Sequence, residues 1–417
     1  MNTRDQGSVQ TTQSDALKAK LEEVIHKSAS FRNPTPSPDL LTALDDDDLF
    51  ASRHALWAIK NWGDEVQPLL VVDERFPGNE VKCVSTGNGC HGFYPKLCAD
   101  KLVRRAIESN SADQAIAWLQ KVLSTQTATG HYITALWNVP VDAEIQLTPT
   151  VSIIPFEQVP DSRHKRALGP EAIFRSFRIW FDMETPSSAL VIRQQVTPFV
   201  RELGGDYPNN TGDLWSQVND VIDALTLIGP RIPIHAANWY SFDDPDIELA
   251  LEGSGRGGRT MEIIPKSNTE KLPELNVEEA RLVIEKYCAL APEAKTKAGI
   301  AIHRLRHSLA RHQAGESAIE ICIAFEILLA DGERGNIGKY VGQRGAKLLS
   351  NDPQEQSRVS ELLEQIYKIR NELVHRGKQM TDPIEIGGQT LAAGKITHQA
   401  SLLCADIIKK LILGGGI

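Results

Sequence analysis

The sequence predicts an α+β protein in which a mixed, β-rich N-terminal domain is followed by an all-α helical bundle. Between residues 40 and 272 the apolar residues fall in short runs, many of them β-branched, separated by Pro, Gly and Asp, which is typical of strands. After residue 276 the apolar residues recur at helical spacing to the end of the chain. A chain of 417 residues is also long enough for two separate cores. We therefore expect a tail, short helix and Pro-rich linker at 1–39, a mixed domain at 40–275 and a helical bundle at 276–417.

The N-terminal segment begins with a polar tail over residues 1–14. A short amphipathic helix follows, because Leu17, Leu21, Val24 and Ile25 fall on one face of a helical wheel. The segment 33–38 contains three prolines, which remove donors and restrict the preceding residues, so it is a linker or a stiff loop.

The mixed domain is expected to hold extended apolar runs at 66–73, 144–156, 174–181 and 189–196, with helices near 101–124 and 213–227. A glycine-rich stretch at 253–259 has no Lys-Ser/Thr pair after it, so we interpret it as a flexible loop rather than a phosphate cradle. The acidic run 45–48 is expected to be solvated or to cap the next helix.

The C-terminal domain is expected to contain five or six helices between residues 277 and 413, with Pro292, Pro353 and Pro383 at helix boundaries. The third helix, 317–329, is apolar almost all round, which predicts that it lies at the centre of the bundle.

The best-defined helix of the bundle runs from Pro353 to the residue before Gly377. Asp352 is its expected N-cap, Glu355 completes a capping box, and Gly377 ends it. On a helical wheel the core-facing stripe is Leu362, Ile366, Ile369 and Leu373.

Three polar residues near the end of this helix lie away from the stripe. Arg370 borders it, whereas Asn371 and His375 lie about 140° and 180° from Ile366 and point outward. A plain alternative is that Arg and His complement the helix dipole. The spacing alone does not decide, since Arg306 and His312 repeat the pattern with one residue more between them.

Composition and charge describe an ordinary folded chain. Hydrophobic residues make up 41% and charged residues 24%, and no run of about 18 apolar residues occurs, so we expect a cytoplasmic protein with no membrane partner. Six cysteines without a signal peptide predict reduced thiols. Residues from 276 onward hold 19 Lys and Arg against 17 Asp and Glu, and the remainder holds 26 against 37. The C-terminal domain is not basic enough to hold long nucleic acid by charge alone.

Segments 316–329, 337–349 and 366–377 together resemble the Apea-like branch of the HEPN superfamily. The resemblance covers about a third of the chain. It includes the Arg-x4-His motif of Arg370 and His375, and Asn371 stands where many relatives carry Ser. It also includes an acidic residue in the buried helix, a Lys-x4-Arg pair in the next helix and a Tyr before the motif, which are Glu326, Lys339, Arg344 and Tyr367.

The resemblance implies an endoribonuclease that needs no metal or cofactor. It implies that His375 and Arg370 of two protomers meet across a homodimer interface, with His375 as general acid or base, Arg370 on the scissile phosphate, and Asn371 orienting His375 or the ribose. The products would be a 2′,3′-cyclic phosphate and a 5′-OH. The implied setting is antiviral defence by abortive infection, with RNA as substrate and a phage-derived or protein trigger acting on the N-terminal domain.

Five further residues have a weaker connection to this chemistry. Glu326 and Tyr367 are expected to be structural, because a buried Glu needs a cationic partner. Lys339, Arg344 and Arg376 either line an RNA groove or form an ordinary exposed basic face.

Two alternatives place the function elsewhere. In the first, the bundle is a non-catalytic dimerisation or nucleotide-binding module. In the second, the N-terminal domain is an enzyme. Cys83, Cys90, His91 and Cys98 are numerous enough for a zinc site but lack a Cys-x2-Cys knuckle. His303 and His307 have the spacing of a metal pair, yet no carboxylate follows in register, so a solvated basic helix is favoured over a phosphate-contacting strip.

Overall fold

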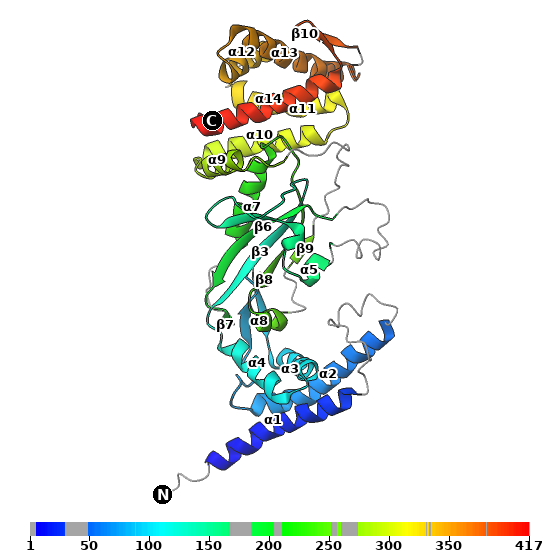
Figure 1. The fold of residues 1–417 in the computed structure, drawn as a ribbon, viewed down its shortest axis with the longest axis vertical. Helices are drawn as coiled ribbons and strands as arrows, with labels where there is room; N and C mark the ends of the chain where they lie inside the picture. The colour runs from blue at the N-terminus through cyan, green and yellow to red at the C-terminus, as the bar shows by residue number, and fades with distance from the viewer. Residues whose placement is uncertain are drawn as a thin grey trace.

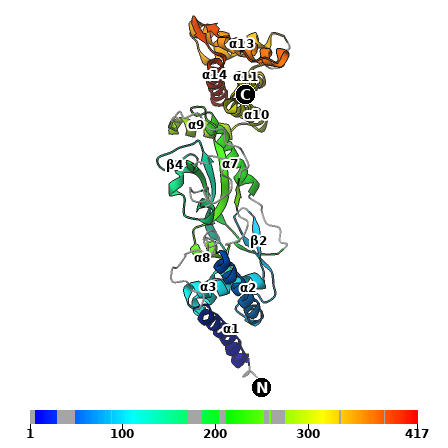
Figure 2. The same cartoon turned by 90° about the vertical axis from the view of Figure 1, so that its right-hand side faces the viewer.

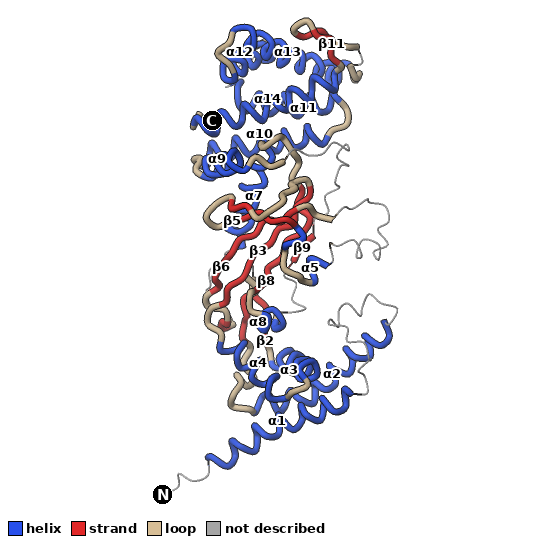
Figure 3. Tube along the Cα trace, in the orientation of Figure 1, coloured by secondary structure: helices blue, strands red, loops and turns tan. Residues whose placement is uncertain are grey.

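The computed structural model describes residues 6–29, 49–87, 89–166, 168, 185–203, 211–251, 257–259, 274–330, 332, 335–380 and 382–416. These residues form three blocks that follow one another along the long axis of an elongated molecule (Figure 1). The first and last blocks are mainly helical, and the largest sheet lies between them (Figure 3). The α+β class expected from the sequence is confirmed, with sheets in the N-terminal half and helices in the C-terminal region.

The first block consists of four helices and a small antiparallel sheet with the strand order β2-β1-β7. Leu17, Leu21 and Val24 are fully buried on α1, as its apolar spacing predicts. The helix begins at Gln6, so the expected polar tail is shorter than residues 1–14. The segments 33–38 and 45–48 lie outside the described residues. The elements are α1 (Gln6–Ser28), α2 (Leu49–Val72), β1 (Lys82–Ser85), β2 (Cys90–Phe93), α3 (Pro95–Ser109), α4 (Ala112–Ser124) and β7 (Val200–Glu202).

The apolar run at 66–73, expected to be extended, is instead the last part of α2. Ile59, Val66 and Leu70 are seven and four residues apart, which places them on one helix face, and all three are buried in the core. Packing against the neighbouring helices therefore outweighs both the β-branched composition and the proline at position 68, which lies inside the helix.

The middle block is a six-stranded antiparallel sheet with the order β4-β5-β6-β3-β8-β9. The strands expected at 144–156 and 189–196 and the helix at 213–227 are confirmed, and the run 174–181 lies outside the described residues. Gly257, Gly258 and Arg259 form an edge strand that pairs with β8, so this part of the glycine-rich stretch is not the loop we expected. The elements are β3 (Ala128–Trp137), β4 (Ile145–Gln146), β5 (Val151–Pro155), a 3-10 turn (Phe156–Gln158), α5 (Arg163–Arg166), β6 (Ser188–Val196), α7 (Thr211–Thr226), β8 (Ile234–Phe242), α8 (Pro245–Ala250) and β9 (Gly257–Arg259).

The two faces of this sheet are covered differently. Tyr132 and Leu136 on β3 belong to the main core together with residues of α7. On the other face, Ile133, Ala135 and Trp137 belong to a second, smaller core. Because side chains alternate along a strand, the two cores lie on opposite sides of the sheet.

The last block contains six helices among the described residues, in agreement with the sequence. Pro292 and Pro353 occupy first-turn positions, whereas Pro383 lies in the connection before a hairpin. The elements are α9 (Val277–Cys288), α10 (Pro292–Ala310), α11 (Ala314–Phe325), a π-helical turn (Glu326–Ala330), α12 (Ile337–Leu349), α13 (Pro353–Arg376), β10 (Ile384–Ile386), β11 (Gln389–Leu391) and α14 (Ala393–Gly414).

Helices α9 and α10 lie next to α7 and the sheet, and α12 and α13 lie at the far end of the molecule (Figures 1 and 2). The Lys295 ammonium is 2.5 Å from the Asp220 carboxylate, and the Tyr287 hydroxyl donates to Asp223 at 3.2 Å, so both bonds join the bundle to α7. Within the part of the chain described above, no helix combines the length and apolar character needed to cross a membrane.

Candidate functional site

Helix α13, which carries the candidate motif, is delimited largely as its sequence predicts. The Asp352 side chain accepts a hydrogen bond from the Gln354 backbone N–H at 3.1 Å, and Gly377 ends the helix with a left-handed φ of 63°. The capping-box prediction is wrong. The Glu355 carboxylate binds Arg358 at 2.6 Å, and the Asp352 N–H donates to the Ser350 hydroxyl instead.

The expected faces of α13 are also observed. Leu362, Ile366 and Ile369 are fully buried in the bundle, and Leu373 is half-buried. Arg370 is half-buried at the edge of this stripe. Asn371 and His375 are exposed, as the helical wheel predicts.

Arg370 and Asn371 are joined by a hydrogen bond. The guanidinium Nη1 donates to the amide oxygen of Asn371 at 3.1 Å. Arginine has no acceptor, so the oxygen rather than the nitrogen of the amide must face it. Asn371 thus orients Arg370, whereas the sequence suggested that it orients His375 or the ribose.

A fourth residue, which the sequence analysis missed, completes this strip. Val374 is 48% exposed although it is a large apolar residue. By ideal helix geometry it lies about 40° from Arg370 and about 100° from His375, between the two motif residues. The signal was present in the sequence, because the wheel that placed Asn371 outward places Val374 beside it. We call Arg370, Asn371, Val374 and His375 the α13 strip.

Beneath the strip, Tyr367 is buried close to Glu326. Burial raises the pKa of Tyr367, Cys322 and Glu326 raise it further, and Arg370 opposes the change. Burial likewise raises the pKa of the Cys322 thiol, again with Arg370 opposing and Glu326 adding to it. Since Glu326 and Arg370 act on the same two side chains, all four groups share one neighbourhood.

Glu326 also begins the π-helical turn, which the sequence did not indicate. Such turns interrupt α-helices rarely, and they frequently occur at functional sites. Glu326 is half-buried, and cationic Arg370 belongs to the same neighbourhood through their shared influence on Tyr367.

The three basic residues assigned weakly to RNA binding differ in their contacts. Arg344 donates to the Leu329 carbonyl at 3.0 Å and so holds the π-helical turn. Arg376 binds Glu372 at 2.8 Å one turn earlier on α13. Lys339 is exposed on the first turn of α12.

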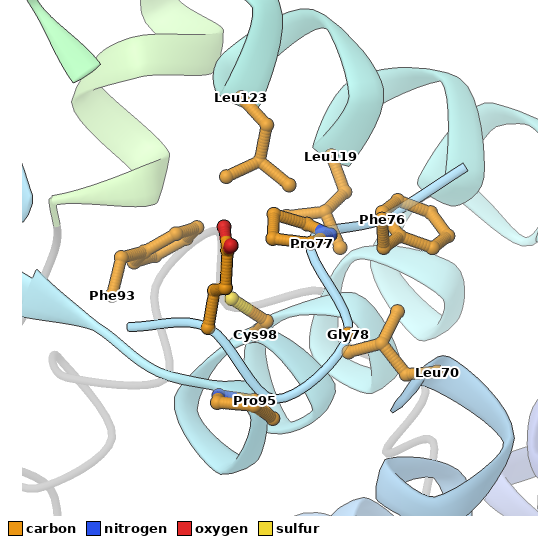
Figure 4. Close-up of a pocket in the computed structure, with 10 residues that line it drawn as sticks. Leu70, Phe76, Pro77, Gly78, Phe93, Pro95, Cys98, Leu119 and Leu123 are labelled. Carbon is orange, nitrogen blue, oxygen red and sulfur yellow. The ribbon is translucent and has the colours of Figure 1, made fainter. Parts of the chain in front are cut away.

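The cysteine cluster is only partly assembled. Cys83 pairs with Gly92 across β1 and β2, which places Cys83 and Cys90 on one face and His91 on the other. Cys98 lies in an apolar cavity lined by Leu70, Phe93 and Leu119 among others (Figure 4), and burial raises its pKa to about 12. Among the described residues, no three His, Cys, Asp or Glu side chains converge as metal ligands would. The six cysteines are free thiols.

The histidine pair of α10 faces two different carboxylates. His303 Nε2 is 3.7 Å from Asp223 on α7, and His307 Nδ1 is 3.9 Å from Glu320 on α11. The two imidazole rings therefore face different carboxylates. The basic residues of α10 contact acidic groups of the protein itself in addition to solvent.

No protein-family model, curated protein or solved structure matches this chain.

Proposed function

We propose that the protein is a metal-independent endoribonuclease of the HEPN type whose composite site forms when two α13 strips meet in a homodimer. The observation that carries the proposal is the exposed strip itself. Asn371, Val374 and His375 are exposed on α13 and half-buried Arg370 borders them, and α13 lies at the end of the molecule farthest from the first block (Figure 1). The central sheet and helices α9 and α10 lie between this end and the first block (Figure 1).

The residue types fit cleavage by the RNA's own ribose. The 2′-oxygen attacks the adjacent phosphorus as His375 removes its proton, and the bond to the 5′-oxygen breaks. The 5′-oxygen takes up a proton from the imidazolium or from water, which leaves a 2′,3′-cyclic phosphate and a 5′-OH. Arg370 stabilises the charge that develops on the phosphate through its planar donors, held by Asn371.

The proposed mechanism needs a dimer because Arg370 and His375 of one protomer point in different directions from α13. Arg370 and His375 lie about 140° apart around an ideal helix, so a single strip does not direct both at one phosphate. A two-fold axis beside α13 brings His375 of one protomer toward Arg370 of its partner. Burying Val374 of both copies supplies an apolar contact at this axis.

The direct test compares RNA cleavage by the wild type and His375→Ala in excess EDTA. We expect the variant to lose about 10²- to 10⁴-fold in rate, because general acid–base catalysis contributes that much. His398→Ala is the matched control, since His398 is an exposed histidine on α14 of the same bundle. Equal cleavage by the wild type and His375→Ala, or a strict metal requirement, would contradict the mechanism.

Subunit mixing tests the composite site. Arg370→Gln and His375→Ala are each expected to be inactive, but their heterodimer contains one intact pair. Random exchange makes about half of all dimers heterodimeric with one of two sites intact, so activity should recover to about a quarter of the wild-type level. No recovery after confirmed exchange contradicts a site shared between protomers. Absence of cleavage by a wild-type dimer would favour a non-catalytic dimerisation or nucleotide-binding module.

A further inference from the structure

A polar hollow of about 710 Å³ lies on one face of the central sheet. The strand register brings its lining together, because Thr129 pairs with Gln195 and His131 with Arg193 across β3 and β6. Farther along the same face, Ile133 and Ala135 are covered by the second core. The face thus changes from buried and apolar to open and polar within one strand. We call this hollow the sheet groove, lined by Thr129, His131, Glu144, Ser152, Arg193 and Gln195 among others.

Two basic side chains of the groove are held by one carboxylate. His131 Nδ1 is 2.9 Å from Asp243, and the Arg193 guanidinium is 4.0 Å from the other oxygen of the same group. The backbone N–H of Asp243 donates to the Thr129 carbonyl at 3.0 Å, which fixes the carboxylate beside β3. With Nδ1 directed at Asp243, the second ring nitrogen of His131 remains for a ligand. Arg193 is 73% exposed, so its charge is available in the groove.

The remaining lining indicates the class of ligand. Hydroxyl and amide groups from Thr129, Ser152 and Gln195 donate and accept hydrogen bonds, and Glu144 accepts them. This pattern matches an anion that also carries several hydroxyl groups. No phenyl or indole ring is among the described residues that line the groove, so the lining contacts a phosphate and a sugar and offers no aromatic stacking surface for a base. The hollow is also several times larger than a phosphate ion needs.

One residue on the rim of the groove contacts the C-terminal bundle, because Arg281 on α9 donates to the carbonyl of Gln146 at 2.7 Å. The Thr150 hydroxyl is 3.4 Å from Gln217 on α7, the helix of the middle block that contacts the bundle. Both Gln146 and Thr150 line the groove. A ligand bound there lies next to Gln146, whose carbonyl accepts from the bundle, and next to Thr150, which contacts α7.

We propose that the sheet groove binds a phosphorylated sugar, either free or as part of a nucleotide, with Arg193 and His131 at the phosphate and the hydroxyl and amide side chains at the sugar. This site belongs to the N-terminal part of the chain and does not depend on ribonuclease activity.

Calorimetric titration of the full-length protein tests the proposal with four probes: ribose 5-phosphate, AMP, ribose and inorganic phosphate. We expect saturable binding of ribose 5-phosphate or AMP, with ribose and inorganic phosphate at least tenfold weaker, because each offers only half of the contacts. AMP binding tenfold tighter than ribose 5-phosphate identifies a nucleotide as the source, and equal binding identifies a free sugar phosphate.

Arg193→Gln and His131→Gln should each weaken the binding at least tenfold, since each removes a charged or orienting contact to the phosphate. Arg358→Gln is the matched control, because Arg358 is also a partly exposed arginine beside a carboxylate, that of Glu355, but lies on α13 away from the groove. Thermal unfolding confirms that each variant is folded. The proposal is overturned if neither sugar phosphate binds saturably, if inorganic phosphate alone binds as tightly, or if folded Arg193→Gln binds like the wild type.

Discussion

Helices α10 and α13 carry similar polar residues but differ in what faces them. Arg306 on α10 is only 19% exposed, donates to the Pro233 carbonyl at 2.9 Å and lies 3.9 Å from Asp223. His312, which with Arg306 almost repeats the motif spacing, lies beyond the end of α10 at Ala310. Arg370 on α13 instead bonds the next residue of its own helix, and His375 is exposed one turn later.

The difference follows from position in the fold. Helix α10 lies between α7 and the rest of the bundle, so its basic groups meet the carboxylates of α7 and α11. Helix α13 lies at the far end, where the polar groups of the strip face outward. Similar residue types at similar spacing thus stabilise the fold in one helix and are available to a ligand in the other.

The largest contrast is expected between Arg370→Gln and Arg306→Gln. Arg370→Gln should lower RNA cleavage about 10²- to 10³-fold, because the charge that stabilises the transition state is lost. Arg306→Gln should change cleavage less than about twofold and lower the free energy of unfolding by about 1 kcal/mol, since it weakens a partly buried hydrogen bond. Cleavage rates and urea unfolding of both variants measure this. Equal effects of the two substitutions on cleavage contradict the distinction.

The next contrast concerns exposed apolar residues on the same two helices. Val374→Glu should raise the dimer dissociation constant at least tenfold, because it places two like charges near the two-fold axis and removes apolar contact. Ile300→Glu on α10 is the matched control, since Ile300 is 46% exposed, and it should leave the dimer intact. Light scattering after size-exclusion chromatography reports both. A Val374→Glu protein that dimerises like the wild type places the interface elsewhere.

Local signals in the sequence identified α13 well. Asp352, Gly377 and the buried stripe act within one or two turns, so the residues that determine them are adjacent in sequence. The outward direction of Asn371 and His375 follows from the same periodicity.

Features that depend on distant contacts were not predictable. Residues 66–72 are helical because their apolar side chains pack on neighbouring helices. Glu326 begins a π-helical turn in which the Leu329 carbonyl accepts a hydrogen bond from Arg344 of the next helix. His131 and Asp243 are brought together by the pairing of β3 with β8, which no local pattern indicates.

A smaller effect is expected from the carboxylate that holds α10 to α11. The Glu320 side chain is 10% exposed and accepts from Arg304 at 3.0 Å and Arg311 at 3.5 Å. Glu320→Gln should lower the free energy of unfolding by about 1–2 kcal/mol, because its partners are themselves partly exposed. Glu316→Gln, on the exposed side of the same helix, should have little effect. Both should cleave RNA at the wild-type rate, whereas a strong loss of cleavage in Glu320→Gln would assign α10 to the site.

The smallest effect is a pH dependence at Asp223, the carboxylate that faces Arg306. Burial raises the pKa of Asp223, while His303, Arg306 and Tyr287 partly oppose this and Asp220 adds to it. The folded state therefore holds the proton more tightly than the unfolded chain, whose ordinary value is 3.8. As the pH rises above that value, the unfolded chain ionises first and the stability contributed by this group decreases until the pH passes the folded-state pKa.

Asp223→Asn removes the titration, so its free energy of unfolding should rise relative to the wild type between about pH 4 and neutrality. Urea unfolding across this range, with the exposed Asp382→Asn as control, measures the difference. If the free energies of unfolding of the wild type and of Asp223→Asn change with pH in parallel, ionising the buried Asp223 carboxylate costs no stability. Helices α10 and α13 would then differ only in how exposed their polar residues are.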